Sequence, residues 1–247
     1  MNKRNRLTMG LIVAIAALAC ACPASGLIPG GDQGGPTPGL PFVPVTEEPQ
    51  IEIPESPTNI LYSDDFSGSD SKMETYSTES GSAGSENGVY VVRAQKNLWA
   101  WGRSDPEFAN TVVDVDATVV AGPSNNNNGF GVYCRVAEAA DGGIDGYALV
   151  ISADGFYSIQ VFTPKEFTPL VDWTQSSVIK QGNQTNHIRA TCNGSDLKLE
   201  VNGSEVAAAV APAGGPASGA ISLVATSFEE SEPYTEIHYD NLTVSQP

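Results

Sequence analysis

From about Asn59 onward, hydrophobic and polar residues alternate in short runs that turn residues separate. The clearest run, TVVDVDATVVAG, places Val113, Val115, Ala117 and Val119 on one face and polar side chains on the other. A period of two residues is typical of a β-strand that buries only one of its faces. This part of the chain is therefore predicted to form strands that each turn one face toward a hydrophobic core.

Short turns join several of these runs. Asp154-Gly155 separates YALVIS from FYSIQVF, and Asn202-Gly203 follows LKLEV. Asp-Gly and Asn-Gly between alternating runs are typical of β-hairpins. We count about a dozen strands and no convincing helix, because the alanine-rich stretch 205–215 is short and interrupted by proline. The pattern predicts an all-β protein, a two-sheet antiparallel sandwich or jelly roll.

The first 22 residues have the composition of a signal peptide. MNKRNR is basic, LTMGLIVAIAALA is apolar, and small residues with two cysteines follow. Such an order is typical of secretory signals, and the apolar run is too short to span a bilayer comfortably. We therefore expect the protein to be exported.

Ala17-Leu18-Ala19-Cys20 resembles a bacterial lipobox, in which the cysteine becomes the lipidated first residue of the mature chain. The leucine stands two places before Cys20 rather than the usual three. Lipidation at Cys20 is the prediction, with Cys22 as the weaker candidate and plain cleavage after an Ala-x-Ala site as the alternative. A lipid would anchor the domain to the membrane at the extracellular face of the cell envelope. Without it the protein would be secreted.

Residues 23–58 form a region of different composition. Nine of the 17 prolines of the chain lie between positions 23 and 57, with many glycines and almost no aromatic residues. Such a segment cannot bury a core, and it is expected to be an extended, disordered stalk. The predicted domains are thus the signal at 1–22, the stalk at 23–58 and one β-sandwich at 59–247.

The chain is strongly acidic, with 29 Asp and Glu against 12 Lys and Arg and a net charge of -17. Because such a surface repels phosphate backbones, nucleic acid is excluded as a partner. The acidity favours solubility, although a role in cation binding is the alternative.

The two remaining cysteines are predicted to form a disulfide. In GFGVYCRVAE, Cys134 shares a face with Phe130, Val132 and Val136, and Cys192 occupies an apolar position of HIRATC. Two core-facing cysteines in an exported domain are expected to pair. A reactive thiol is the alternative, but the sequence holds no Cys-x-x-Cys or neighbouring Cys-His pattern.

Tryptophans provide the candidate binding residues. Trp99 and Trp101 in NLWAWGR stand two apart, so they face the same side of a strand. Adjacent aromatic rings can stack on the apolar face of a sugar, or they can simply fill a core. Trp173 is expected at a core or edge position.

Catalytic signatures are weak in this sequence. The pattern Glu-x-Asp-x-x-Glu on one strand would supply the paired carboxylates that a glycosidase needs, and no such triplet is present. Asp114 and Asp116 are expected on a solvated strand face, and His187 and His238 are expected to point outward or pack on the sheet. Glu229, Glu230 and Glu232 are expected in a solvated loop. The sequence thus leans against an enzyme.

The stretch TNHIRATCNGSDLKLEVNG, with GAISLVAT and EIHYDNLTV after it, resembles the concanavalin A-like lectin/glucanase superfamily. The nearer likeness is to laminin G-like and three-keto-disaccharide-hydrolase-type domains, which commonly open with an Asp-Asp-Phe strand such as YSDDFSG. The likeness covers residues 60–245. It implies two curved antiparallel sheets with a concave face that often handles carbohydrate, and it leaves function open between lectins, glycosidases and adhesion modules.

The resemblance also suggests a structural calcium ion. Asp64 and Asp65 open the first predicted strand and Asp240 ends the last, which is where related sandwiches often bind Ca²⁺ through hard oxygen ligands. The alternative is that Asp65 caps a turn and Asp240 is solvated.

These observations together predict an exported, lipid-anchored surface protein whose sandwich binds an extracellular glycan without cleaving it. A hydrolase of the three-keto-disaccharide type and a purely structural adhesion module are the alternatives.

Overall fold

The computed structural model describes residues 59–140, 142–229 and 234–247, all of which belong to one compact unit. The predicted signal, Cys20, Cys22 and the predicted stalk lie outside these ranges. No helix among the described residues is long and apolar enough to cross a membrane.

Fifteen strands and no helix make up the described residues. The strands are β1 (Ile60–Asp64), β2 (Tyr76–Ser77), β3 (Gly81–Glu86), β4 (Val89–Gln95), β5 (Trp99–Phe108), β6 (Thr111–Ala121), β7 (Asn128–Glu138), β8 (Ile144–Ile151), β9 (Phe156–Phe162), β10 (Phe167–Gln175), β11 (Asn186–Asn193), β12 (Asp196–Val201), β13 (Ser204–Val210), β14 (Gly219–Ser227) and β15 (Tyr234–Ser245).

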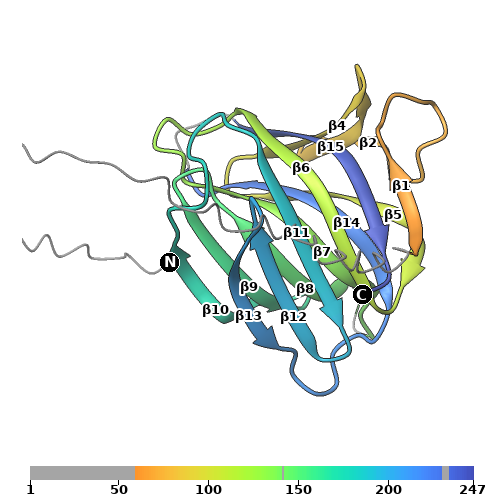
Figure 1. Ribbon diagram of the computed structural model, residues 1–247. Coiled ribbons are helices and arrows are strands. Elements are labelled where there is room, and N and C mark those ends of the chain that lie inside the picture. The colour runs from red at the N-terminus through yellow and green to blue at the C-terminus, as the bar shows by residue number, and fades with distance from the viewer. Residues whose placement is uncertain (1–58, 141, 230–233) are drawn as a thin grey trace, which may run out of the picture. The chain divides into compact units, whose positions relative to one another are not determined.

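These strands form two antiparallel sheets that pack face to face (Figure 1). The large sheet has nine strands, in the order β13-β12-β11-β6-β15-β4-β3-β2, with β1 also paired to β15. The small sheet has six strands, in the order β10-β9-β8-β7-β14-β5. The predicted all-β two-sheet sandwich is therefore confirmed.

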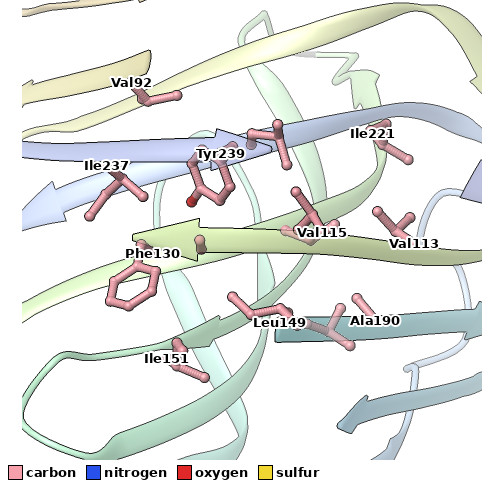
Figure 2. Close-up of a cluster of buried hydrophobic side chains, with 14 of the residues drawn as sticks. Val92, Val113, Val115, Phe130, Leu149, Ile151, Ala190, Ile221, Ile237 and Tyr239 are labelled. Atoms are coloured by element: carbon pink, nitrogen blue, oxygen red, sulfur yellow. The ribbon is translucent and has the colours of Figure 1, made fainter. Parts of the chain in front are cut away.

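The core lies between the two sheets and follows the alternation seen in the sequence (Figure 2). Val113, Val115, Ala117 and Val119 of β6 are all at most 3% exposed. Val113 and Val115 belong to the same core cluster as Phe130, Leu149 and Ile151 of the small sheet, as Figure 2 shows. Burial of such side chains contributes about 25 cal/mol per Å² of apolar surface.

Two features tie the sheets together across this core. Cys134 of β7 and Cys192 of β11 form the predicted disulfide, with a Cα–Cα distance of 6.7 Å. Tyr239 of β15 is fully buried, and its hydroxyl donates to the carbonyl oxygen of Val224 at 2.6 Å and accepts from the Gly131 amide at 2.9 Å. Both links join the large sheet to the small one.

One predicted position is wrong. Val136 was expected beside Cys134 in the core, but a β-bulge interrupts β7 between Cys134 and Ala137. Arg135 takes a left-handed backbone conformation there, with φ of 52°, and shifts the following residue to the other face. Val136 therefore packs on the outer face of the small sheet.

Candidate functional site

The outer face of the small sheet is strongly curved. Trp99 lies on β5 and Phe167 on β10, the two edge strands of this sheet, yet their ring centroids are 5.3 Å apart. In a flat sheet, five steps of about 4.8 Å would separate these strands by about 24 Å. The sheet must therefore curl so that its edges approach each other over its outer face, which we call the concave face.

Small residues line the middle of the concave face, and aromatic rings lean over them from the sides. Gly131, Gly146 and Ala148 occupy central positions of β7 and β8. A side chain at Gly131 would collide with the Leu149 carbonyl, so the backbones approach closely there. Small central residues leave room for the rings above them.

The rings on the concave face form one continuous cluster. Tyr133 lies 4.6 Å from Phe162 and 5.8 Å from Trp99, measured between ring centroids. Phe228 then connects Trp99, at 6.0 Å, to Trp173, at 5.7 Å. Offset and edge-on contacts of this kind are worth about 0.5–1.5 kcal/mol each beyond area burial.

A pocket of about 270 Å³ opens beside this cluster, at the β5 edge. We call it the Trp pocket. It is lined by Glu74, Tyr76, Thr78, Ser80, Gly81, Trp99, Ala100 and Trp101. Its walls thus combine two indole rings with a carboxylate and several hydroxyl groups.

The polar groups of the Trp pocket are held by the backbone around them. The Tyr76 hydroxyl accepts a hydrogen bond from the Trp101 amide at 3.3 Å, and burial raises the pKa of the Tyr76 phenol. The Thr78 hydroxyl donates to the Gly81 carbonyl at 2.9 Å. From the described residues, the Glu74 carboxylate accepts only one long hydrogen bond, from the Arg103 amide at 3.4 Å. Glu74 therefore has acceptor capacity left for a ligand.

Two hydroxyl groups on the concave face have no hydrogen-bond partner among the described residues. They belong to Tyr133, which is 1% exposed, and Ser222, which is fully buried and pairs with Tyr133 across β7 and β14. A buried polar group left unpaired costs about 1–3 kcal/mol.

The predicted pair Trp99 and Trp101 is thus brought together on one face, and both rings are half-buried rather than flat on the surface. Glu74 and Tyr76 were not anticipated. They lie around the two-residue strand β2, which shows no alternation, so no local pattern could reveal that they meet the tryptophans.

Two of the three predicted calcium residues, Asp64 and Asp65, line one surface pocket together with Asn241, the neighbour of Asp240. Asp64 accepts hydrogen bonds from the Phe66 amide and the Tyr62 hydroxyl. Asp65 accepts hydrogen bonds from the backbone amide and the side-chain hydroxyl of Ser67. Asp240 accepts from the neighbouring Asn241 amide. In the part of the chain that the structure describes, no three acidic, His or Cys side chains converge to hold a metal. Calcium binding stays a prediction, which thermal unfolding with calcium and with chelator would test.

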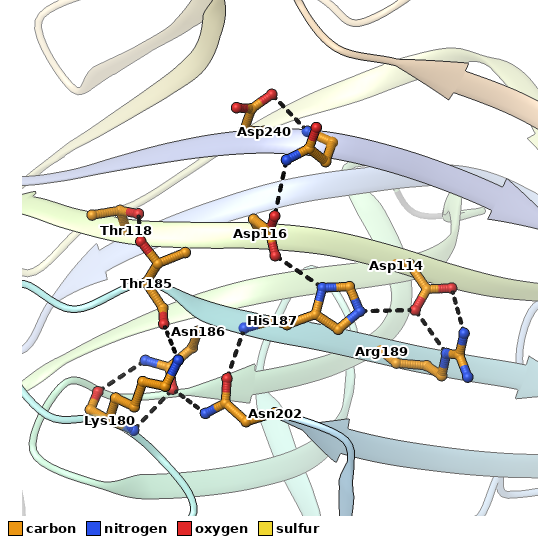
Figure 3. Close-up of polar contacts among 11 residues, drawn as sticks. Asp114, Asp116, Thr118, Lys180, Thr185, Asn186, His187, Arg189, Asn202 and Asp240 are labelled. Atoms are coloured by element: carbon orange, nitrogen blue, oxygen red, sulfur yellow. Dashed lines mark hydrogen bonds and ion pairs between the residues drawn. The ribbon is translucent and has the colours of Figure 1, made fainter.

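A second polar cluster lies on the outer face of the large sheet, which we call the charged face (Figure 3). His187 contacts Asp116 at 2.9 Å and Asp114 at 3.2 Å, and Arg189 donates to Asp114 at 2.7 Å. Asn241 donates to Asp116 at 2.9 Å. His187 does point outward, as predicted, and its partners are residues of this same open face.

Comparison with known proteins bears on the fold. No protein-family model matches the sequence, and no curated protein matches it. Solved structures do match.

A carbohydrate-binding module from Bacillus subtilis is 14% identical, with a TM-score of 0.55 over 71% of this chain and 96% of the module. A protein of unknown function with a galectin-like fold, also from Bacillus subtilis, is 12% identical, with a TM-score of 0.54 over 76% of this chain and 96% of that one. A family 7 alginate lyase is 13% identical, with a TM-score of 0.50 over 70% of this chain and 85% of the lyase chain. The chain thus has the β-sandwich fold of galectin-like and concanavalin A-like domains, and the narrower likeness to laminin G-like domains stays a prediction.

Proposed function

We propose that this protein binds a glycan at the Trp pocket, without cleaving it, on the outside of the cell. The observation that carries the proposal is the pairing of Trp99 and Trp101 on the concave face, in one pocket with Glu74 and Tyr76. Apolar walls with a few convergent polar groups are typical of small-ligand sites.

A sugar ring fits this chemistry. The axial C–H groups of a pyranose form an apolar face that can lie against an indole ring, and its hydroxyl groups at the edge need polar partners. The Glu74 carboxylate can accept from two such hydroxyls, and Thr78 and Ser80 can exchange hydrogen bonds with others. The volume of about 270 Å³ suits a single sugar residue at the end or side of a longer chain.

The fold neighbours support a carbohydrate ligand. One is named as a carbohydrate-binding module and another as an alginate lyase. Since the sequence identities are 14% and 13%, the neighbours support the class of ligand and no particular sugar.

Binding without hydrolysis is the favoured activity. Glycosidases of the usual type use two carboxyl groups about 5–10 Å apart across the scissile bond. Glu74 is the one carboxylate among the described residues that line the Trp pocket. Asp114 and Asp116, the acidic pair of the charged face, lie on the large sheet instead.

A glycan array with the full chain, compared with its Trp101→Ala variant, tests the proposal. We expect selective retention of one glycan class by the wild type and at least a tenfold loss in the variant. Trp173→Ala is the matched control, because Trp173 is another half-buried indole of the concave face but does not line the Trp pocket. Equal retention by wild type and Trp101→Ala, or release of cleaved sugar, would refute non-catalytic binding at this pocket.

We further propose that the domain is exported and anchored by a lipid on Cys20. The Cys134–Cys192 disulfide supports an oxidising compartment, since such bonds persist mainly outside the cytosol. Metabolic labelling with a fatty-acid analogue should mark the wild type and not Cys20→Ser. Label that persists in Cys20→Ser and disappears in Cys22→Ser would move the anchor to Cys22.

A further inference from the structure

A second pocket, of about 500 Å³, opens at the end of the sandwich near the disulfide. We call it the Arg135 pocket. Asn110, Arg135, Tyr147 and Ser195 line it from the strands and their turns, and Pro212 and Pro216 belong to the segment that forms its remaining wall.

Arg135 is the unusual residue of this pocket. It is only 4% exposed, and its guanidinium lies 5.9 Å from the centroid of the Tyr147 ring. It donates to the carbonyl oxygens of Ala109 at 2.6 Å and Gly194 at 2.7 Å, and to the Asn110 side-chain oxygen at 3.1 Å. All three acceptors are neutral.

The positive charge of Arg135 has no counter-ion in the described structure. Arg135 forms no ion pair with an acidic side chain in the ranges that the structure describes. A guanidinium has five N–H groups, of which three are used here. A buried charge is normally paired with an opposite charge, because desolvation is costly.

Tyr147 adds a second donor to the same pocket. Its hydroxyl makes no hydrogen bond with another described residue, and burial, followed by a weaker contribution of Asp145, raises the pKa of this phenol despite the nearby Arg135. The phenol therefore stays protonated at neutral pH and can donate. Gly215 lies directly against this oxygen, and a methyl group there would overlap it.

From these contacts we infer that the Arg135 pocket binds the carboxylate of an acidic sugar residue, with Arg135 and Tyr147 as donors and Pro212 and Pro216 against the carbon skeleton. A planar guanidinium with free N–H groups suits a carboxylate, which would also supply the missing counter-charge. The choice of a sugar over other organic acids rests on the proposed function. The carboxylate site itself does not.

Calorimetric titration of the full chain with galacturonate, galactose and acetate tests the inference. Galacturonate and galactose differ in the carboxylate, so galacturonate should bind at least tenfold more tightly. Tyr147→Phe keeps the ring under Arg135 and removes one donor to a charged group, so it should weaken galacturonate about tenfold. Gly215→Ala should also weaken galacturonate, because the added methyl group crowds the phenol.

Asp114→Asn, on the charged face, is the matched control and should leave galacturonate affinity unchanged. Galacturonate affinity that falls in Trp101→Ala but not in Tyr147→Phe would place the sugar in the Trp pocket and refute the carboxylate site. If galactose and galacturonate bind alike, or if a folded Tyr147→Phe binds as well as the wild type, the carboxylate site is refuted. If acetate binds as tightly as galacturonate, the sugar assignment is refuted. A glycan array that fails while galacturonate still depends on Tyr147 would refute only the proposed function of the Trp pocket.

Discussion

The two outer faces of this sandwich have opposite chemistry. On the charged face, Asp114 and Asp116 each contact His187, and Arg189 and Asn241 complete their hydrogen bonds. On the concave face, two half-buried tryptophans line a pocket in which the Glu74 carboxylate keeps acceptor capacity. One face thus satisfies its own polar groups, while the other leaves both apolar surface and polar capacity for a ligand.

The two outer faces therefore differ in what they contribute to the protein. Paired charges on an open face keep a protein soluble and add little stability, with exposed pairs worth about 0–1 kcal/mol. A curved face with aromatic edges is harder to maintain, because rings from β5 and β10 must meet across the sheet. Four substitutions test this difference between the two faces.

The largest loss of stability is expected from removal of the Cys134–Cys192 disulfide, which joins the two sheets. Replacing Cys134 and Cys192 together by alanine should lower the free energy of unfolding by about 4 kcal/mol, because their sequence separation of 58 closes a long loop. Urea unfolding of the variant measures this loss, with reduced wild type as the control. A loss below about 1 kcal/mol would mean that core packing alone holds the sheets together.

Trp99→Ala should affect the concave face next most strongly. Trp99 stacks on Phe167 and also contacts Tyr133 and Phe228, so its removal should cost about 2 kcal/mol of stability, less than for a fully buried tryptophan. Trp101→Ala, which removes an indole without such ring contacts among the described residues, should cost about 1 kcal/mol or less. Thermal unfolding compares the two, and equal losses would show that Trp101 is also a packing residue.

Asp114→Asn should affect only the charged face. It removes the charged partner of Arg189 and His187, and since both of those side chains are about half exposed, the cost should stay below about 1 kcal/mol and shrink with added salt. Glycan retention should remain at the wild-type level. Reduced retention would show that the charged face contributes to glycan binding and would refute the proposed difference between the two faces.

The smallest effect is a pH dependence on the charged face. Burial opposes ionisation of Glu236, but hydrogen bonds from Arg93 and His238 leave its pKa lowered, and Arg93 also lowers the pKa of Glu86. Carboxyl groups with lowered pKa values stabilise the fold above their unfolded pKa, near 4.5, and lose this contribution as the pH falls through the folded pKa. Arg93→Gln should therefore flatten the stability curve below about pH 5. Superimposable curves of wild type and variant between about pH 3 and 5 would contradict this.

The local sequence pattern was sufficient to predict the strands and the disulfide. The alternation of β6 named Val113, Val115 and their neighbours as core residues, and Cys134 and Cys192 stood at apolar positions of their strands. Turn chemistry located the hairpins, since Asn202 and Gly203 both adopt the positive φ values that such turns require. These features depend on the period of a strand and on single-residue conformations, which a sequence displays directly.

Tertiary structure alone decided where the candidate sites lie. The bulge at Arg135 moved Val136 out of the core. The Arg135 side chain lines a pocket that no sequence motif indicates. Curvature brought Trp99 to Phe167. A bridge between Met73 and Ser104 of β5 placed Glu74 beside the tryptophans. Alternation tells which face of its own strand a residue occupies. Which residues of distant strands meet depends on sheet curvature, register and packing, and these are properties of the whole sandwich that no local stretch of sequence contains.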